Sequence, residues 1–295
     1  MTAPAARVAA QAKLNLHLRI LSREESGFHS LETIFHRIDL ADDIVVTATA
    51  SERTIDVSGP DTGPAESNLA FRAAGAYAGH VGWPSGFRIE LTKRIPIGAG
   101  LGGGSADAAA VLRALNSLSP QPIPQLQLLQ LAAELGSDVA FLASNAVMAL
   151  AWGRGERIFE CAPLPRKDIL LMTPDFSVST ADAYRWLDED RARTDAPTSI
   201  PIVLDDIALS TWGSIARFAR NDFEEPVSAR HPELIEYLGK LRSSRALFAQ
   251  MTGSGSTVFG VLETPPNFAK VPEEHRARVT TTMTSIDVVQ PVRVG

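Results

Sequence analysis

The chain has 295 residues, of which 45% are apolar and 21% are charged, and its formal net charge is −6. Its 21 glycines and 19 prolines are ordinary for a globular protein and argue against a collagen-like or low-complexity chain. The 28 Lys and Arg residues form no basic stripe, so we expect no nucleic-acid partner. The single cysteine, Cys161, cannot form an intramolecular disulfide, and we interpret it as a spectator thiol in a reducing compartment.

The N-terminal stretch does not read as a secretion signal. Residues 1–13 (MTAPAARVAAQAK) carry Arg7 and Lys13 where a signal peptide needs an uninterrupted apolar segment. No window approaches the roughly 18 consecutive apolar residues that a membrane span requires. We therefore expect a cytoplasmic protein that makes no contact with a membrane.

Residues 12–20 (AKLNLHLRI) alternate between apolar and polar side chains, which predicts a strand. One face carries Leu14, Leu16, Leu18 and Ile20, and the other carries Lys13, Asn15, His17 and Arg19. Further strands are expected at 43–50, 54–57, 87–95 and 146–152. Helices are expected over 67–77, from near Ser105 to Pro120, and from Pro124 to Gly136.

The pattern changes after Pro165. Residues 169–174 begin a second set of strands and helices, with helices in 211–230 and 232–248. Residues 188–205 are charged and aperiodic, which favours a surface loop, and a glycine turn at 252–256 leads into a strand. The length and this pattern predict an α+β chain of two domains with a boundary near 160–168.

The most informative segment places five glycines within residues 98–104, between a predicted strand and a predicted helix. Glycines allow positive φ angles and a close approach of the backbone to a ligand. The following helix directs its first free N–H groups and the positive end of its dipole into the loop, an arrangement that binds phosphate oxygens. Ser105 occupies the position of an N-cap.

Several glycine loops fit this pattern in part. A P-loop requires a Lys after the last glycine, and none follows here. Gly98, Gly100 and Gly103 match the spacing of the dinucleotide fingerprint, but residues 118–128 (LSPQPIPQLQL) lack the acidic residue expected about 20 positions on. A turn that binds no ligand is a further alternative, although five glycines make it costly in entropy.

Residues 96–105 also fit the pattern PxxxGLGGGS, and this loop resembles that of the GHMP small-molecule kinases. Other segments that are similar to this family follow in the family's order: 12–18, 26–42, 135–142, 151–156, 221–224 and 251–259. Within the family the chain resembles the branch that phosphorylates a hydroxyl of a cytidine diphosphate alcohol in non-mevalonate isoprenoid biosynthesis. The resemblance implies a ribosomal protein S5 domain 2-like domain over 1–165 and a ferredoxin-like α/β sandwich over 166–295.

The resemblance also implies roles for individual residues. Asp138 would orient the attacking hydroxyl or act as its base, and Lys13 would be its cationic partner. An ammonium lowers the pKa of an adjacent carboxylate, so we favour positioning and electrostatics over strong base catalysis. The nucleotide phosphates would lie against Pro96, Ile97, Gly98, Ala99, Gly100, Leu101, Gly102, Gly103, Gly104, Ser105 and Ala106, and the adenosine near Asn68 and Lys93.

On the substrate side, the resemblance implies contacts from Asn15, Phe28, His29, Thr180 and Tyr184. Phe28 stands where the family usually has Tyr, so stacking on a cytosine ring remains possible without a hydroxyl contact. Phe28 and Tyr184 would form a sandwich around the base, although both could equally be core residues. Gly253, Ser254 and Gly255 would close the site from the C-terminal domain.

The expected cofactors are ATP and the Mg²⁺ carried by ATP, and the sequence assigns no metal ligand. Ala106 replaces a frequent Ser of the family, which leaves the magnesium ligands open. We expect a monomer or a weak homodimer. Two alternatives remain at this point: a GHMP kinase for another small alcohol, such as homoserine, mevalonate or a sugar, and a nucleotide-binding regulator without turnover.

Overall fold

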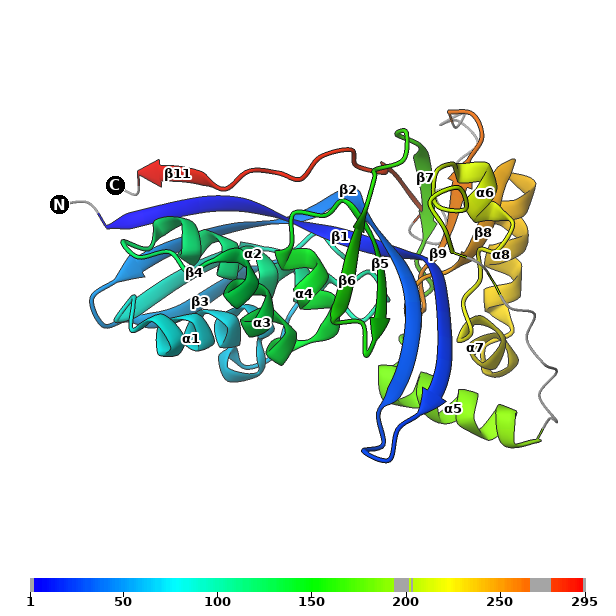
Figure 1. Cartoon of the computed structure of the whole chain (residues 1–295), viewed down its shortest axis with the longest axis horizontal. Helices are drawn as coiled ribbons and strands as arrows, with labels where there is room; N and C mark the ends of the chain where they lie inside the picture. The colour runs from blue at the N-terminus through cyan, green and yellow to red at the C-terminus, as the bar shows by residue number, and fades with distance from the viewer. Residues whose placement is uncertain (1–2, 194–201, 203, 266–276, 294–295) are drawn as a thin grey trace.

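A computed structural model describes residues 3–193, 202, 204–265 and 277–293. The larger sheet has seven strands, with the order β11-β1-β2-β4-β3 and with β5 paired to β2 and β6 paired to β5 (Figure 1). These strands are β1 (Pro4–Arg23), β2 (His29–Thr49), β3 (Arg53–Ser58), β4 (Gly86–Thr92), β5 (Met148–Gly153), β6 (Arg157–Cys161) and β11 (Gln290–Arg293). All of its pairs are antiparallel except β3 with β4.

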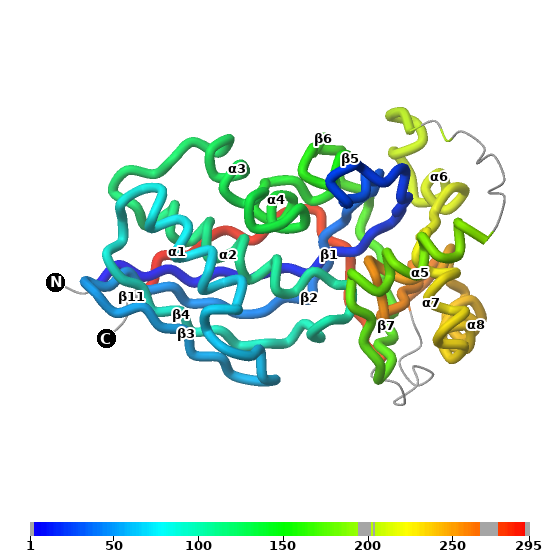
Figure 2. Tube along the Cα trace, turned by 90° about the horizontal axis from the view of Figure 1, so that it is seen from below, coloured from blue at the N-terminus to red at the C-terminus, as the bar shows by residue number. Residues whose placement is uncertain are grey.

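The helices of the first half of the chain gather beside this sheet (Figure 1, Figure 2). They are the 3₁₀ turn η1 (Ala65–Ser67), α1 (Leu69–Val81), α2 (Gly103–Leu118), α3 (Gln125–Leu135) and α4 (Ser137–Ala143). Helix α2 is the central one, and its alanines, such as Ala108 and Ala114, are buried. Because these side chains are small, α2 can pack closely against β1, α1 and α4 and fix its N-terminal end relative to the sheet.

The second half of the chain forms a four-stranded antiparallel sheet. Its strands are β7 (Asp168–Met172), β8 (Ala246–Met251), β9 (Val258–Leu262) and β10 (Arg278–Thr281), in the order β10-β7-β9-β8. The helices α5 (Thr180–Arg193), α6 (Trp212–Ala216), α7 (Glu224–Arg230) and α8 (Glu233–Ser243) accompany it. Taken in chain order the strands lie 4-1-3-2, so the α+β class and the ferredoxin-like second half are confirmed. Within the described residues, no helix combines the length and the apolarity needed to cross a bilayer.

The hairpin of β1 and β2 joins the two halves. Its strands are 20 and 21 residues long, and they run from the large sheet to α5 (Figure 1). Leu14 and Leu16 pack in the core of the first half, while Leu18 and Ile20 pack in that of the second. The polar face of β1 is also buried, because it lies against the second half of the chain: His17 Nδ1, for example, is 3.1 Å from the carbonyl oxygen of Phe218.

Some predicted elements were wrong. Residues 188–193 continue α5 and are not part of a loop, while 194–201 and 203 lie outside the described residues. Helix α8 lies within the range 232–248 in which a helix was predicted, and the segment after it pairs with β9 as strand β8. Strand β6 and helix α4 were not predicted. Strand β6 pairs with β5 and strand β8 with β9, and the periodicity of a single segment does not report such pairing.

The predicted boundary at residue 165 falls between β6 and β7. One element departs from a simple division there. Strand β11 returns to the large sheet, where Ala5 lies opposite Val292 and Ala6 opposite Pro291. Residues 290–293 therefore add to the first half of the structure, although the sequence assigned them to the second. The assignment of the rest of the chain to domains 1–165 and 166–295 stays a proposal.

The fold places a titratable side chain where protonation is costly. His36 is fully buried, its Nδ1 lies 2.8 Å from the carbonyl oxygen of Arg37, and its ring lies 5.5 Å from that of Trp212. Its Nε2 has no hydrogen-bond partner among the described residues. Burial lowers the pKa of His36 to about 4, from 6.5. The unfolded chain therefore binds more protons than the folded one between these two pH values.

We predict that His36 costs the folded state no stability above about pH 6.5. As the pH drops from there toward 4, the contribution of His36 lowers the free energy of unfolding by about 3 kcal/mol in total. Denaturant unfolding at several pH values measures this slope. In His36→Leu the decline should be smaller by that amount, whereas His80→Gln, a change at an exposed histidine of α1, should keep the parent slope. Equal slopes in the parent and His36→Leu would contradict the assignment.

Candidate active site

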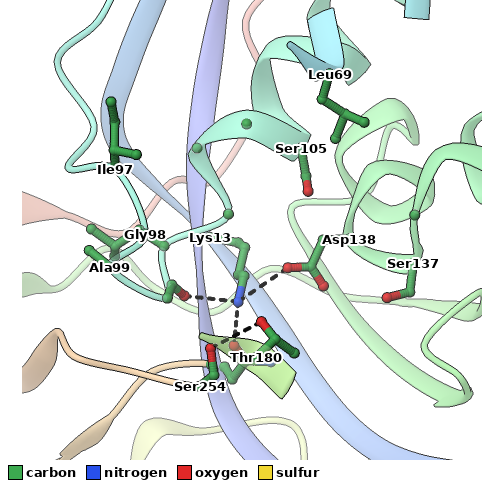
Figure 3. Close-up of a pocket in the computed structure, with 18 of the residues that line it drawn as sticks. Lys13, Leu69, Ile97, Gly98, Ala99, Ser105, Ser137, Asp138, Thr180 and Ser254 are labelled. Atoms are coloured by element: carbon green, nitrogen blue, oxygen red, sulfur yellow. Dashed lines mark hydrogen bonds and ion pairs between the residues drawn. The ribbon is translucent and has the colours of Figure 1, made fainter. Parts of the chain in front are cut away.

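A cavity of about 690 Å³ lies where the glycine loop, β1, the start of α4, the start of α5 and the turn at 252–256 meet. Figure 3 shows the side chains of Lys13, Asp138, Thr180 and Ser254 converging there. These residues are far apart in the sequence, and long-range packing brings them together. The cavity has the size of an ordinary small-molecule site.

Lys13 is the buried cation of this cavity. Its side chain is 3% exposed, and its Nζ donates to Asn15 Oδ1 at 2.6 Å and to the carbonyl oxygen of Gly100 at 3.0 Å. Asp138 Oδ2 lies 3.4 Å from the same Nζ. A buried ammonium requires such oxygens, because a desolvated charge without partners is costly. The carboxylate that the sequence predicted beside Lys13 is thus in place (Figure 3).

Asp138 belongs to a helix that the sequence analysis missed. It is the second residue of α4, which begins directly after α3 ends, and its side chain is 29% exposed. One oxygen therefore pairs with Lys13 while the carboxylate still borders the cavity. The Asp138 carboxylate and the Lys13 ammonium thus lie side by side at the wall of the cavity, where a ligand hydroxyl can reach the carboxylate.

The glycine loop approaches both Lys13 and the turn at 252–256. A Cβ on Gly100 would lie 2.1 Å from the carbonyl oxygen of Thr252, and one on Gly102 would lie 3.0 Å from Lys13 Cε and 3.6 Å from Asp138 Oδ2. The φ angles of these two glycines are +77° and +71°, which side chains rarely tolerate. The loop is therefore held in place by contacts in which a side chain would not fit.

Helix α2 begins earlier than predicted. Gly102 is its N-cap and Ser105 its third residue, so the prediction that Ser105 caps the helix was wrong. The N–H of Ala106 donates to the carbonyl oxygen of Gly102 at 2.8 Å, which is the first bond of the helical ladder. The N–H groups of Gly103, Gly104 and Ser105 precede that bond and form the anion-binding end of a 16-residue helix.

The remaining loop residues divide into two groups. Ile97 is about half exposed and Gly98 also borders the cavity, as does Pro96. Ala99, Leu101 and Ala106 are buried, at 4%, 1% and 2% exposed. The carbonyl oxygen of Leu101 accepts the backbone N–H of Lys13 at 3.0 Å, which ties the loop to β1. Ala99 and Leu101 still border the cavity, whereas Ala106 does not.

The two residues expected near adenosine have other partners in this structure. Asn68 caps α1, accepting the N–H of Ala70 at 2.9 Å. Lys93 pairs with Asp42 and, at 2.7 Å, with Asp107 Oδ2. Both residues border the cavity, but the ammonium of Lys93 is already held by two buried carboxylates. Adenosine contacts from Asn68 and Lys93 stay predictions.

Sequence reasoning missed Asp42 and Asp107, which surround Lys93. Asp42 also accepts the backbone N–H of Ile95 at 2.8 Å, whereas Asp107 Oδ1 has no partner among the described residues. Burial raises the pKa of Asp107 to about 7. Two carboxylates share one ammonium here, so this cluster connects β2, the residue that follows β4 and the first turns of α2. The one local signal was a charged residue inside the alanine-rich segment SADAAA at 105–110.

Four of the expected substrate residues, Phe28, His29, Thr180 and Tyr184, border a second cavity of about 1250 Å³ that adjoins the first, whereas Asn15 borders the first cavity alone. Phe28 is 57% exposed, and the guanidinium of Arg154 lies 4.0 Å from its ring centre. Tyr184 stacks on His29 at 4.5 Å, and His29 Nε2 lies 2.9 Å from Asp188 Oδ1. Tyr184 thus has His29 as its stacking partner, and the sandwich of Phe28 and Tyr184 around a base stays a prediction.

Tyr184 is held from several sides. Its ring also meets Phe223 edge-on at 4.8 Å, and burial, with the nearby charge of Asp138, raises the pKa of Tyr184 to about 12. Its hydroxyl is therefore neutral at physiological pH. Tyr184 borders both cavities, and it therefore lies between Phe28 and His29, which line the second cavity, and Asp138, which lines the first.

Asn15 and Thr180 complete the surroundings of Lys13. Besides accepting from Lys13, Asn15 donates from Nδ2 to Thr33 Oγ1 at 2.9 Å, so its amide is fixed in one orientation. Thr180 Oγ1 lies 3.3 Å from Ser254 Oγ, and both line the cavity with Gly253. Gly255 supports the glycine loop by its contact with Gly100 and is not among the residues that line the cavity.

The close approach at Gly100 gives a stability test. We predict that Gly100→Ala lowers the free energy of unfolding by about 2 kcal/mol or more, because the added Cβ meets the carbonyl oxygen of Thr252 and the φ angle is positive. Gly104→Ala is the matched control: nothing lies within 4 Å of its added Cβ, so its stability should stay within about 0.5 kcal/mol of the parent or rise slightly. Denaturant unfolding of the ligand-free proteins compares the two, and equal losses would contradict the loop geometry.

Comparison with known proteins agrees with the geometry of the site. Residues 68–151 match the GHMP kinases N terminal domain, and residues 203–280 match GHMP kinases C terminal. A curated 4-diphosphocytidyl-2-C-methyl-D-erythritol kinase of Syntrophomonas wolfei is 35% identical over 275 residues, which covers 91% of this chain and 93% of that protein.

Solved structures show the same likeness. A crystal structure of 4-(cytidine 5'-diphospho)-2C-methyl-D-erythritol kinase superposes with a TM-score of 0.75 and 36% identity, over 94% of this chain and 98% of the other. Homoserine kinase from Cytophaga hutchinsonii shares the fold, with a TM-score of 0.67 at 18% identity, over 98% of this chain and 97% of the other. At 35% identity over nine-tenths of its length, the chain belongs to the 4-diphosphocytidyl-2-C-methyl-D-erythritol kinases, a family of GHMP kinases.

Proposed function

We propose that the chain transfers the terminal phosphoryl group of ATP to the 2-hydroxyl of 4-diphosphocytidyl-2-C-methyl-D-erythritol, giving the 2-phosphate and ADP in non-mevalonate isoprenoid precursor biosynthesis. One observation carries this assignment. The Lys13 ammonium and the Asp138 carboxylate are 3.4 Å apart, beside the residue that caps α2. A phosphate bound at the head of that helix would therefore lie next to both charges.

The helix head suits a polyphosphate. The N–H groups of Gly103, Gly104 and Ser105 and the dipole of α2 favour negative oxygens, and Gly102 allows a ligand to approach closely. We infer that the β- and γ-phosphates of ATP lie against these groups. Mg²⁺ would arrive on the phosphates and keep several waters, as it usually does in kinases. The described residues hold no group of three His, Cys, Asp or Glu side chains placed to bind a metal.

Lys13 and Asp138 would divide the chemistry. The Lys13 ammonium would stabilise the charge that spreads over the oxygens of the transferred group. The Asp138 carboxylate would accept a hydrogen bond from the substrate hydroxyl and aim it at the phosphorus. Because the transition state for phosphoryl transfer is loose, little proton abstraction is needed early, and a carboxylate stabilised by an ammonium suffices as an orienting group.

The second cavity would hold the cytidine end of the substrate. Phe28 offers an exposed aromatic face, and His29 and Tyr184 form the adjoining wall. This arrangement favours a substrate with a base over homoserine, mevalonate or a sugar, which have no aromatic base to stack. CMP and CDP should compete with the alcohol substrate, and an absence of competition would favour a kinase for another alcohol. Release of ADP with the alcohol would exclude a regulator without turnover.

We predict that Asp138→Asn lowers kcat about 100-fold or more, because a neutral amide accepts the hydrogen bond of the hydroxyl more weakly than a carboxylate and no longer pairs with the Lys13 charge. ATP affinity should stay close to that of the parent, since the N–H groups at the head of α2 remain. Coupled measurement of ADP release gives kcat, and titration calorimetry gives the nucleotide affinity. As a matched control, Asp56→Asn changes an exposed aspartate of β3 that borders neither cavity and should keep the parent kcat. A fully active Asp138→Asn would contradict the role of this residue.

A further inference from the structure

The two cavities meet at a short junction. Among the described residues, five line both cavities: Gly136, Ser137, Arg154, Thr180 and Tyr184. A substrate with its base on Phe28 and its reacting hydroxyl at Asp138 must pass through this junction. In the proposed substrate the group between base and alcohol is a diphosphate. The junction should therefore contain a partner for negative charge, and Arg154 is the charged member of the five.

Arg154 is fixed in a defined orientation although its side chain is 47% exposed. It lies between β5 and β6, and its Nη2 donates to Glu24 Oε2 at 2.6 Å and to Ser26 Oγ at 3.2 Å. Its Nε lies 3.4 Å from Glu24 Oε1, which makes the pair two-pronged. The hydrogen bond from Arg154 holds the pKa of Glu24 below its usual range, so this carboxylate stays ionised. The tip of the β1–β2 hairpin thus holds one edge of the guanidinium.

The other edge of the same guanidinium is available. A guanidinium has five N–H groups, and Nε and Nη2 account for three of them. The two on Nη1 make no hydrogen bond to the described residues. The flat face of the guanidinium lies 4.0 Å from the ring centre of Phe28. Arg154 can therefore keep both its stacking contact and its ion pair while Nη1 donates to a ligand.

The other cations near the cavities are differently placed. Lys13 lies at the reacting end with Asp138, and Lys93 is held by two buried carboxylates. Three further arginines, Arg23, Arg157 and Arg185, border the second cavity but not the junction, and each is paired with a carboxylate. Arg154 therefore differs from these cations in two ways: it lines the junction, and the two N–H groups of its Nη1 are free to donate to a ligand.

We propose that Arg154 binds the diphosphate of the substrate and makes the enzyme specific for a nucleoside diphosphate-linked alcohol. This inference rests on the proposed function for the identity of the substrate. Glu24 holds Nε and Nη2, and Nη1, which this pair leaves free, donates to a non-bridging oxygen. The two free N–H groups of Nη1 only donate, which suits phosphate oxygens better than a base, because a base presents donors as well as acceptors. Because the guanidinium also contacts Phe28, base binding and diphosphate binding are adjacent on one surface.

The test compares ligands that share the base and differ in phosphate. CDP and cytidine are measured as competitors of the alcohol substrate in the parent and in Arg154→Gln. We expect the variant to bind CDP about tenfold more weakly or worse, since a hydrogen bond to a charged group is lost, while cytidine binding changes by less than about threefold. KM for the alcohol substrate should rise with the CDP constant, and KM for ATP should not. Arg154→Lys, which keeps the charge without the fork, should recover only part of the CDP affinity.

Arg166→Gln is the matched control, because it removes the same charge at an exposed arginine that borders neither cavity. It should bind CDP and cytidine like the parent. Equal weakening of CDP and cytidine in Arg154→Gln, or no change in either, would overturn the inference while the proposed function stands. A parent that neither phosphorylates the cytidine diphosphate alcohol nor binds CDP would overturn the proposed function and the inference with it.

Discussion

The burial of a single ammonium organises the centre of this molecule. Lys13 lies on a strand that is covered on both faces, and its side chain is 3% exposed. Such a charge needs oxygen partners on every side that water would otherwise occupy. Asn15, the carbonyl of Gly100 and the carboxylate of Asp138 provide them. Each partner comes from a different part of the first half of the chain, so satisfying one cation brings the strand, the glycine loop and α4 into a fixed relation.

The same strand explains why the site lies between the two halves. Leu14 and Leu16 belong to one core and Leu18 and Ile20 to the other, so β1 is shared by both. The turn at 252–256 then meets the glycine loop backbone to backbone at Gly100. The head of α2, the Lys13 cation and the Asp138 carboxylate, to which we assign phosphate and acceptor binding, are placed by packing that is already complete without ligand. This preorganisation is what an electrostatic contribution to phosphoryl transfer requires.

The sequence predicted well what is encoded locally. Three features could be predicted because neighbouring residues alone determine them. They are the alternation at 12–20, the five glycines before an alanine-rich helix, and the limits of α3 at Pro124 and Gly136. The pairing of Lys13 with Asp138 came from the order of the motifs, which a resemblance to a family supplies. Distant contacts were missed: Asp42 beside Lys93, His29 against Tyr184, and β11 beside β1. Ser105 was misassigned as the N-cap because Gly102, in a left-handed conformation, begins the helix without a side-chain cap.

The most direct measurement is a crystal structure of the enzyme with a non-hydrolysable ATP analogue, Mg²⁺ and the cytidine diphosphate alcohol. The account predicts the phosphates at the N–H groups of Gly103, Gly104 and Ser105, with the terminal phosphate in contact with the Lys13 ammonium. It also predicts the substrate hydroxyl within hydrogen-bond distance of the Asp138 carboxylate and in line with the terminal phosphorus. A terminal phosphate bound away from Lys13, or a hydroxyl held by another residue with Asp138 turned elsewhere, would contradict the account.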